Sequence, residues 1–528
     1  MGKFYITTPI YYVNANPHIG HAYTQVVVDS LARYHRMLGE EVFFLTGTDE
    51  HGEKIEEACL KAGYKQGQEK EFVDSIVNNF KKVWETLDIS YDGFVRTTGS
   101  SHKKVVQEFL TKMKDAGDIY QGEYDGWFCT PCETFWTDTQ AAGGICPDCK
   151  RPVERIKEKN YFFRMSKYQG WLIDYINKNP DFVRPEFRKN EVLGFLREDL
   201  TDLCISRPKT RSPWGVEIPF DKDYVVYVWF DALINYASGI REKGAFDEFW
   251  PADFHMIAKD IIRHHAVYWP IMLKSMKLAL PKTIFAHGWW KMGDEKMSKS
   301  KGNVIDPVKL VAKYGIDPVR YFLIKAVSLG LDGTFSEDAL VTMYNSDLAN
   351  DLGNLLNRTL TMVEKYFGGI SPEEPKEGAD EAQKERSASL QEAVSKLFPA
   401  VHKKMTTPEL LLKESLDDIM KVAGKANKYI EESAPWVYSK AGDTASIKLI
   451  ILDLLEVLRT SAIALYPFMP HTAQAMWDQL ALGGAVEKEA RVKEISAAGS
   501  KGPGTPGWKA FPSGVKVAKR GPLFPRIQ

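Results

Sequence analysis

A predicted β-strand that runs straight into a helix with two histidines at its start constrains the fold more than any other stretch of the sequence. Residues 3–12 are rich in β-branched and aromatic side chains, and apolar residues then recur at helical spacing from Ile19 to Leu38. His18 and His21 therefore lie at a strand–helix junction. Such junctions in parallel α/β sheets bind ligands, and N–H groups of a first helical turn attract anions. The pattern predicts an α/β fold, in which the histidines form either a phosphate site or a solvated first turn.

The order of strand, polar turn and helix recurs along the chain. A strand is predicted at 41–45, and Asp49 in the turn after it either caps the next helix or faces a ligand ammonium group. Helical periodicity at 74–87 and 102–116 completes a first half. The second half is predicted to contain strands at 224–228, 254–258 and 283–286 and a helix that begins at Trp229. The two halves together predict a Rossmann-like parallel sheet.

Four of the six cysteines form two Cys-x2-Cys pairs that are separated by thirteen residues. This spacing suits four thiolates around one Zn²⁺, whereas the alternative is four unrelated buried thiols. Because four protein ligands leave no position for water, the metal would be structural and would anchor an insertion with little core of its own. The predicted ligands are Cys129, Cys132, Cys146 and Cys149.

Strand signals disappear after residue 335, and long apolar-periodic helices predict an α-helical bundle. Helices are expected at 347–366, 387–404, 413–430, 446–465 and 473–480. Residues 371–381 contain prolines and acids and are interpreted as a solvated connection. The predicted domains are a first catalytic half at 1–118, an insertion at 119–223, a second catalytic half at 224–335, the bundle at 336–485 and a basic irregular tail at 486–528.

Composition limits the partners and the location of the chain. Its 528 residues have a formal net charge of −1, which neither supports nor excludes an RNA partner. The densest apolar run, 449–465, is interrupted by Asp453, Glu456 and Arg459, so no membrane span is expected. Because the N-terminus shows no basic segment followed by an apolar one, a cytoplasmic location is expected.

A lysine-rich segment lies within the second catalytic half, after its last predicted strand. Three lysines fall within six residues from Lys296 to Lys301, directly before a Gly-Asn turn. Such a loop is either solvated surface or a mobile clamp for a polyphosphate.

The order of the motifs resembles the class I aminoacyl-tRNA synthetases: His18-Ile19-Gly20-His21 comes first, and Lys296-Met297-Ser298-Lys299-Ser300 comes second. The two motifs flank a cysteine-rich insertion and precede a helix bundle. Further motifs narrow the resemblance to the methionyl-tRNA synthetases: Thr8–Tyr12, Thr48–Gly52, Trp229–Ala232, Lys259–Ile261 and Asn427–Trp436. The resemblance covers about residues 3 to 480. It departs from the family pattern at Pro9, Leu233 and Ala258, which concerns the fine shape of the pocket.

The resemblance implies that the methionine carboxylate attacks the α-phosphate of ATP and that the methionyl group then passes to the terminal ribose of its tRNA. Because a carboxylate is ionised at pH 7, the first step needs alignment and charge neutralisation rather than a general base. The implied catalytic residues are His18, His21, Lys296 and Lys299. With Mg²⁺ beside the nucleotide, further ATP contacts are implied for Gly20, His287, Gly288, Trp289, Met297, Ser298 and Ser300.

The family pattern also implies a methionine pocket and an anticodon site. The pocket residues are Pro9, Ile10, Tyr12, Asp49, Trp229, Ala232, Leu233, Tyr236, Ile261 and His265. Asp49 would hold the ammonium group, and Tyr12 and His265 could donate to the thioether sulfur. Anticodon contacts are implied for Asn354, Arg358 and Trp436, of which the tryptophan could stack on an unpaired base. A monomer is expected, because the tail lacks the additional oligomer-forming domain of many relatives.

Three alternatives compete with this interpretation. A class I synthetase for another apolar amino acid would share both signature motifs, but those for isoleucine, leucine and valine carry an editing insertion larger than residues 119–223. A non-catalytic tRNA-binding factor derived from a synthetase should have lost phosphate-site residues, and none is missing. A nucleotidyltransferase with a similar pair of loops is disfavoured by the long helix bundle.

Overall fold

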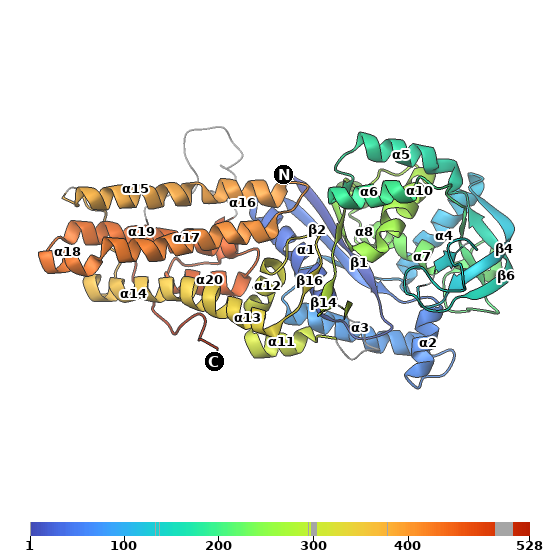
Figure 1. Ribbon diagram of the computed structural model, residues 1–528, viewed down its shortest axis with the longest axis horizontal. Helices are drawn as coiled ribbons and strands as arrows, with labels where there is room; N and C mark the ends of the chain where they lie inside the picture. The colour runs from blue at the N-terminus through green and yellow to red at the C-terminus, as the bar shows by residue number, and fades with distance from the viewer. Residues whose placement is uncertain are drawn as a thin grey trace.

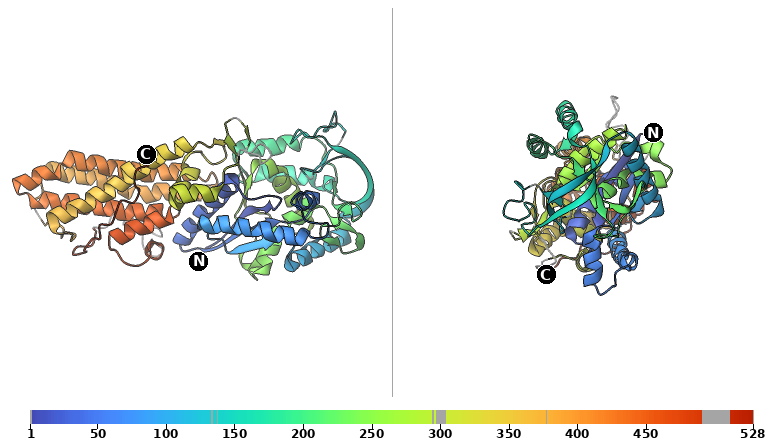
Figure 2. Two further views of the ribbon diagram at one scale, coloured as in Figure 1. Left: turned by 90° about the horizontal axis from the view of Figure 1, so that it is seen from below. Right: turned by 90° about the vertical axis from the view of Figure 1, so that its right-hand side faces the viewer.

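The computed structural model describes residues 2–132, 134–136, 138–293, 295–296, 304–376, 378–490 and 511–527. The molecule is elongated, with a sheet-containing half at one end and a bundle of long helices at the other (Figures 1 and 2). The predicted fold class, an α/β sheet with an insertion followed by a helix bundle, is confirmed.

The central sheet has six strands, all parallel, in the order β3-β2-β1-β12-β13-β7. The strands are β1 Lys3–Tyr12, β2 Glu41–Asp49, β3 Gly93–Arg96, β7 Val183–Arg184, β12 Phe254–Ala258 and β13 Thr283–His287. The strand β1 lies between β2 and β12, so the strand order reverses at its carboxyl end. Crevices at such switch points are where open α/β sheets bind ligands.

Helices cover both faces of the sheet. Successive side chains of β1 enter different cores, since Phe4 and Ile6 belong to one buried cluster and Tyr5 to another. The helices of this half are α1 Ile19–Met37, α2 Glu53–Lys61, α3 Glu69–Thr86, α4 Ser100–Asp115, α7 Val228–Leu233, α8 Asn235–Glu242, α9 Phe246–Phe249 and α10 Trp269–Ser275. The predicted strands at 3–12 and 254–258 are confirmed at both ends, and the predicted first helix extends to Met37.

The strand β2 is longer than predicted and reaches Asp49. Residues 46–48 look like a polar turn in sequence, but Thr46 and Thr48 are fully buried. Thr46 accepts a hydrogen bond from Gln25 at 2.6 Å, so its hydroxyl is satisfied inside the core. At Gly47 an added Cβ would lie 2.1 Å from the Val95 carbonyl oxygen, so only glycine permits the close approach of β3.

The insertion folds around two small antiparallel sheets. One has the order β5-β4-β6-β8 and the other β10-β11-β9. Their strands are β4 Ile119–Cys129, β5 Thr134–Trp136, β6 Glu154–Phe163, β8 Leu203–Cys204, β9 Ser206–Pro208, β10 Glu217–Ile218 and β11 Asp221–Val226, with helices α5 Gln169–Lys178 and α6 Glu186–Phe195.

Two strands exchange places relative to the sequence prediction. The strand predicted at 224–228 is present as β11, but it pairs antiparallel with β9 and β10 instead of joining the parallel sheet. Conversely, β7 comes from the predicted insertion and pairs parallel with β13 at the edge of the central sheet. A two-residue strand leaves too little periodicity in sequence to be recognised.

Beyond the sheet, three connecting helices lead into the bundle: α11 Pro307–Tyr314, α12 Ile316–Lys325 and α13 Glu337–Met343. The bundle contains a π-helix η5 Tyr344–Gly353 and α14 Asn354–Phe367, α15 Glu381–Ser395, α16 Leu397–Thr406, α17 Leu412–Ser433, α18 Pro435–Ala441, α19 Thr444–Leu465, α20 Pro470–Gln479 and α21 Val486–Ala490. The single helix predicted at 387–404 is two helices, because Pro399 has no N–H to bond the carbonyl of Ser395. Among the helices that the structure describes, none has the length and apolar character needed to cross a bilayer.

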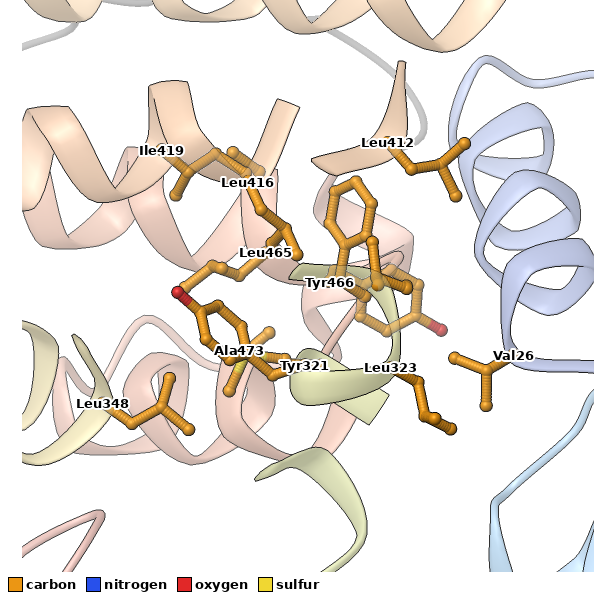
Figure 3. Close-up of a cluster of buried hydrophobic side chains, with 14 of the residues drawn as sticks. Val26, Tyr321, Leu323, Leu348, Leu412, Leu416, Ile419, Leu465, Tyr466 and Ala473 are labelled. Atoms are coloured by element: carbon orange, nitrogen blue, oxygen red, sulfur yellow. The ribbon is translucent and has the colours of Figure 1, made fainter. Parts of the chain in front are cut away.

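One hydrophobic core runs from the sheet into the bundle. Figure 3 shows Val26 of α1 beside Leu323 of α12, in the same buried cluster as Leu416 and Leu465 of the bundle. Beside this cluster Arg320 is fully buried. Its guanidinium donates to a carboxylate oxygen of Asp29 at 2.6 Å and to backbone carbonyls of Leu87 at 3.1 Å and Phe468 at 2.9 Å. These partners come from α1, the end of α3 and the corner after α19, so one side chain joins both halves.

The end of the chain packs back onto the bundle. Ser371 was predicted to lie in a solvated connection, but it is buried, and its hydroxyl donates to the Pro512 carbonyl at 2.6 Å. Phe511 and Phe524 are buried, and Asn345 of η5 forms two hydrogen bonds with the backbone of Ile527 at 2.9 and 3.0 Å. Residues 511–527 of the predicted irregular tail therefore form part of the folded body.

Candidate active site

The two histidines of the first motif cap α1 together. The Nδ1 atom of His18 accepts the N–H of Gly20 at 3.1 Å, and the Nδ1 atom of His21 accepts the N–H of His18 at 3.0 Å. Because both Nδ1 atoms accept, each neutral ring carries its proton on Nε2. The ring centroids are 3.9 Å apart. This cap places two N–H donors beside the helix N-terminus, where an anion is stabilised.

Both ends of the lysine-rich segment are held at α1. On one side β14 Trp290–Met292 pairs with β15 Glu295–Lys296, and the Trp290 ring packs edge-on against Tyr23 of α1 at 5.8 Å. On the other side the carbonyl of Ile305 accepts the N–H of Ile19 at 3.1 Å. Lys296 is placed by its backbone pairing. Four further predicted ATP contacts lie outside the described residues: Met297, Ser298, Lys299 and Ser300.

Of the predicted nucleotide residues at the end of β13, His287 contacts α1. His287 donates from Nδ1 to the Gly288 carbonyl at 2.7 Å and accepts the Thr24 hydroxyl at Nε2 at 2.8 Å. Burial lowers the pKa of His287 to about 4, so the ring is neutral at pH 7. At Gly288 an added Cβ would lie 2.2 Å from the Leu331 carbonyl oxygen, so only glycine fits. Trp289 follows, and its N–H donates to Asp332 at 2.9 Å.

A small cavity of about 20 Å³ lies at the carboxyl ends of β1 and β2, with room for about one water molecule. Nine of the ten predicted methionine residues line it, together with Asn235: Pro9, Ile10, Asp49, Trp229, Ala232, Leu233, Tyr236, Ile261 and His265. The tenth, Tyr12, meets Trp229 edge-on with ring centroids 6.1 Å apart. The structure thus brings together side chains from four segments that are far apart in sequence.

The polar groups of the cavity have fixed roles. His265 donates from Nδ1 to the Ile261 carbonyl at 2.9 Å, and the Tyr236 hydroxyl donates to its Nε2 at 2.6 Å. Burial lowers the pKa of His265 to about 4. The neutral ring therefore has no N–H left for a ligand, and the expected donation from His265 to a thioether sulfur does not fit this geometry.

Two residues of the cavity region were missed by the sequence prediction. Asn235 follows Ala232 by three positions on the same helical stripe, so the spacing alone could have indicated it. His264 stacks on Trp229 with ring centroids 3.8 Å apart, and its burial lowers the pKa of the imidazole. Nothing in the sequence except its neighbour His265 indicates that position.

The four predicted metal ligands converge at the end of β4. Their sulfur atoms all lie within 4.8 Å of one another, and the pairs Cys129–Cys149 and Cys132–Cys146 are 3.6 and 3.9 Å apart. Four sulfurs at about 2.3 Å from a central Zn²⁺ would be separated by roughly 3.8 Å. The cluster can therefore hold a metal ion.

The predicted anticodon residues lie on two helices of the bundle. Asn354 begins α14 and is exposed, and Arg358 one turn later forms an ion pair with Glu431 of α17 at 2.6 Å. Trp436 in α18 is 42% exposed and is therefore not a fully buried structural tryptophan. The helix α18 lies at the end of the bundle away from the sheet (Figure 1).

Comparison with known proteins gives matches along nearly the whole chain. A family model described as tRNA synthetases class I (M) matches residues 4–157 and 151–360, and one described as the anticodon-binding domain of tRNA ligase matches residues 394–499. The methionine–tRNA ligase of Caldanaerobacter subterraneus is 47% identical over 91% of this chain and 74% of its own length. That of Clostridium acetobutylicum is 46% identical over 99% of this chain and 78% of its own length.

Solved structures agree with these matches. A structure of Mycobacterium tuberculosis methionyl-tRNA synthetase in complex with methionyl-adenylate superimposes with a TM-score of 0.90 at 39% identity and covers 100% of both chains. The apo form of the same enzyme gives a TM-score of 0.83 at 36% identity, covering 100% of this chain and 99% of the other.

Proposed function

Because the chain belongs to the methionyl-tRNA synthetases of class I, we propose that its small cavity binds methionine and that the start of α1 binds the phosphates of ATP. The chain is an ATP-dependent methionine–tRNA ligase. The observation that carries the site assignment is the position of the cavity, at the switch point of the sheet and beside the histidine cap.

Methionine fits the chemistry of the cavity. The buried carboxylate of Asp49 would pair with the α-ammonium group, and Pro9, Ile10 and Leu233 offer an apolar wall to the thioether chain. Because the Tyr236 hydroxyl donates its proton to His265, its oxygen presents lone pairs to the cavity. The remaining proposed contacts are Tyr12, Trp229, Ala232, Ile261 and His265.

The phosphates of ATP would meet the Nε2–H groups of His18 and His21 and the N-terminus of α1 beside Gly20. Lys296 and Lys299 would add positive charge as the pyrophosphate departs, and Mg²⁺ would neutralise phosphate charge when the nucleotide is bound. The adenine is assigned to His287, Gly288 and Trp289, and the lysine loop contributes Met297, Ser298 and Ser300.

In the first step the methionine carboxylate attacks the α-phosphate, and the bond from that phosphorus to the bridging oxygen of pyrophosphate breaks. In the second step the ribose hydroxyl of the tRNA attacks the acyl carbon and AMP departs. Since Asp49 and the histidine cap lie at adjacent strand ends, the protein mainly supplies alignment and charge stabilisation.

We further assign one structural Zn²⁺ to the four cysteines, since four thiolates at these distances form a closed tetrahedral site. The anticodon of the tRNA is assigned to Asn354, Arg358 and Trp436, where an exposed indole suits base stacking. The working form is proposed to be a cytoplasmic monomer.

The test is exchange of labelled pyrophosphate into ATP, measured with each of the twenty amino acids. Methionine should support the fastest exchange, and Asp49→Asn should raise the KM for methionine more than the KM for ATP. Faster exchange with another apolar amino acid would overturn the substrate assignment.

A further inference from the structure

A buried chain of hydrogen bonds crosses the catalytic half beside the cavity. His51 Nδ1 lies 2.7 Å from one carboxylate oxygen of Asp231, His102 Nε2 lies 2.8 Å from the other, and His102 Nδ1 lies 2.6 Å from the hydroxyl of Ser238. None of the four side chains belongs to the residues assigned above, and each residue is at most 1% exposed. We call these four residues the His–Asp–His chain.

The chemistry of the groups fixes the direction of each hydrogen bond. An ionised carboxylate only accepts, so His51 donates from Nδ1 and His102 from Nε2. In the neutral ring of His102 the Nδ1 atom carries no proton, so it accepts from the Ser238 hydroxyl. Burial alone would raise the pKa of Asp231, but its interactions with the two histidines outweigh this and hold the pKa well below its usual value.

The His–Asp–His chain joins the two walls of the cavity. His51 lies two residues after Asp49, which lines the cavity from the end of β2, and Asp231 lies in α7 between Trp229 and Ala232, which line it from the opposite side. His102 holds Asp231 from α4, and Ser238 belongs to α8. The His–Asp–His chain therefore spans both halves of the parallel-sheet domain around the cavity.

The position of His51 is itself held from a second side. Its ring packs against Trp214 with centroids 5.6 Å apart, and the indole N–H of Trp214 donates to the Glu50 carbonyl at 2.6 Å. The segment after Asp49 is thus clamped between the insertion and α7. Methionine is larger than the space for about one water that this structure leaves, so the separation of the two walls decides whether the ligand fits and its ammonium group reaches Asp49.

We propose that His51 and His102 are positioning residues for methionine. By donating hydrogen bonds to Asp231, they fix α7 at the distance from Asp49 that the bound amino acid requires. This rests on the proposed methionine site. Removing either donor leaves a buried carboxylate short of a hydrogen bond, and α7 shifts to find another partner. The proposed ATP site is the histidine cap of α1, so ATP binding does not depend on the separation between α7 and Asp49.

The two histidines use different ring nitrogens, and this permits a matched test. The amide nitrogen of Asn lies near the Nδ1 position of a histidine, and that of Gln lies near the Nε2 position. His51→Asn and His102→Gln therefore keep the donor in place. His51→Gln and His102→Asn displace it, with the same polarity and a difference of one methylene group.

The measurement is methionine-dependent pyrophosphate exchange on the full chain, with separate KM values for methionine and ATP and a melting temperature for each variant. His51→Gln and His102→Asn should raise the KM for methionine about tenfold, the effect of losing one hydrogen bond to a charged group. Their KM for ATP should stay within about twofold of the wild-type value, because the α1 cap is untouched. His51→Asn and His102→Gln should remain near wild type for both substrates.

Three results would overturn the proposal. The first is that Asn, or Gln, restores activity at both positions; the second is an equal rise of the KM values for methionine and ATP; the third is a change in melting temperature with unchanged KM values. If a displaced variant does not fold, Ser238→Ala, which removes only the last donor, provides the measurement and should raise the KM for methionine alone. Asp49→Asn separates the proposed methionine pocket from the positioning role. If this variant binds methionine normally, the pocket itself is overturned. If it weakens methionine binding while the His51 and His102 variants bind normally, only the positioning role is overturned.

Discussion

Histidines at this site do different work because different ring nitrogens are engaged. His18 and His21 accept backbone N–H groups at Nδ1 and therefore carry the proton on Nε2. His265 and His287 donate from Nδ1 to backbone carbonyls and accept hydroxyl protons at Nε2. Local backbone geometry thus selects two donors for anions and two acceptors.

Local sequence pattern pointed to the first pair, whereas His265 and His287 were implied only by the family resemblance, and the donation expected from His265 does not fit its hydrogen bonds. The spacing of His18 and His21 at a strand–helix junction is a local signal, whereas the role of His265 depends on Tyr236, a partner on another helix. For the same reason His51 and His102 could not be connected with Asp231, since hydrogen bonds across more than a hundred residues leave no periodicity to detect.

The exposure of Trp436 leads to a prediction at this scale. Trp436→Ala should leave methionine-dependent exchange near normal and reduce tRNA charging by roughly five to 150-fold, since base stacking contributes about 1 to 3 kcal/mol. Because the side chain is 42% exposed, the melting temperature should change little. Equal losses in both reactions, with a large drop in melting temperature, would contradict the anticodon assignment.

Among the secondary-structure elements, long periodic segments were predictable and short or polar ones were not. The strand β1 and the helix α19 match their predicted spans closely. The end of β2 was taken for a turn because its threonines are polar, although their hydroxyls are satisfied inside the core. The short strand β7 takes its place through pairing with β13, which is a tertiary effect.

The cysteine cluster predicts how the insertion depends on metal. Among the described residues, the hydrophobic cluster around Cys129 and Cys146 is small. A bound metal should therefore supply much of the local stability, on the order of 10 kcal/mol for structural Zn²⁺. Cys146→Ser should lower the zinc content measured by elemental analysis and lower the melting temperature. Cys59→Ser, at a buried cysteine outside the cluster, is the control and should retain full zinc. Normal zinc content in the Cys146 variant would contradict the assignment.

A buried carboxylate in α19 predicts a pH dependence of the bundle. Burial raises the pKa of Asp453 to about 6, while Tyr429 donates to it at 2.5 Å. A pKa that is higher in the folded than in the unfolded chain stabilises the fold at low pH, and this contribution is lost as the pH rises through about 6. The shift from 3.8 corresponds to about 3 kcal/mol at most.

Asp453→Asn removes this titration while keeping an amide that can accept from Tyr429. The variant should therefore melt a few degrees higher than the wild type at pH 8, whereas the gain should shrink toward zero near pH 4. Thermal melting of both proteins across this range checks the expectation. A gain of the same size at both ends of the range would show that Asp453 does not titrate in the folded bundle.

At the scale of the whole molecule, one continuous hydrophobic core joins α1 of the sheet-containing half to the helices of the bundle (Figure 3). The helix α1 carries the histidine cap at its start and Asp29 further along, and Arg320 ties Asp29 to the corner after α19. Sequence alone predicted two separate domains here. Their fixed orientation follows from a buried ion pair and apolar contacts that no local pattern indicates.

A tRNA must reach the cavity and the end of the bundle at once, so the orientation set by Arg320 should matter for charging more than for adenylate formation. Arg320→Met leaves Asp29 with Arg33, which keeps α1 in place, but frees the Leu87 and Phe468 carbonyls. Breaking a buried pair in this way costs about 3 to 5 kcal/mol. We expect a lower melting temperature, near-normal exchange and a clear loss of tRNA charging.

Lys384→Met is the matched control, because that lysine forms an exposed ion pair with Glu381 within α15 and should change neither reaction. Melting, pyrophosphate exchange and charging are compared for both variants at a temperature where the Arg320 variant is folded. If Arg320→Met lowers exchange and charging by the same factor, the arginine only stabilises the fold. A loss confined to charging means that the core between α12 and the bundle holds the anticodon end at the distance from the methionine site that a bound tRNA spans.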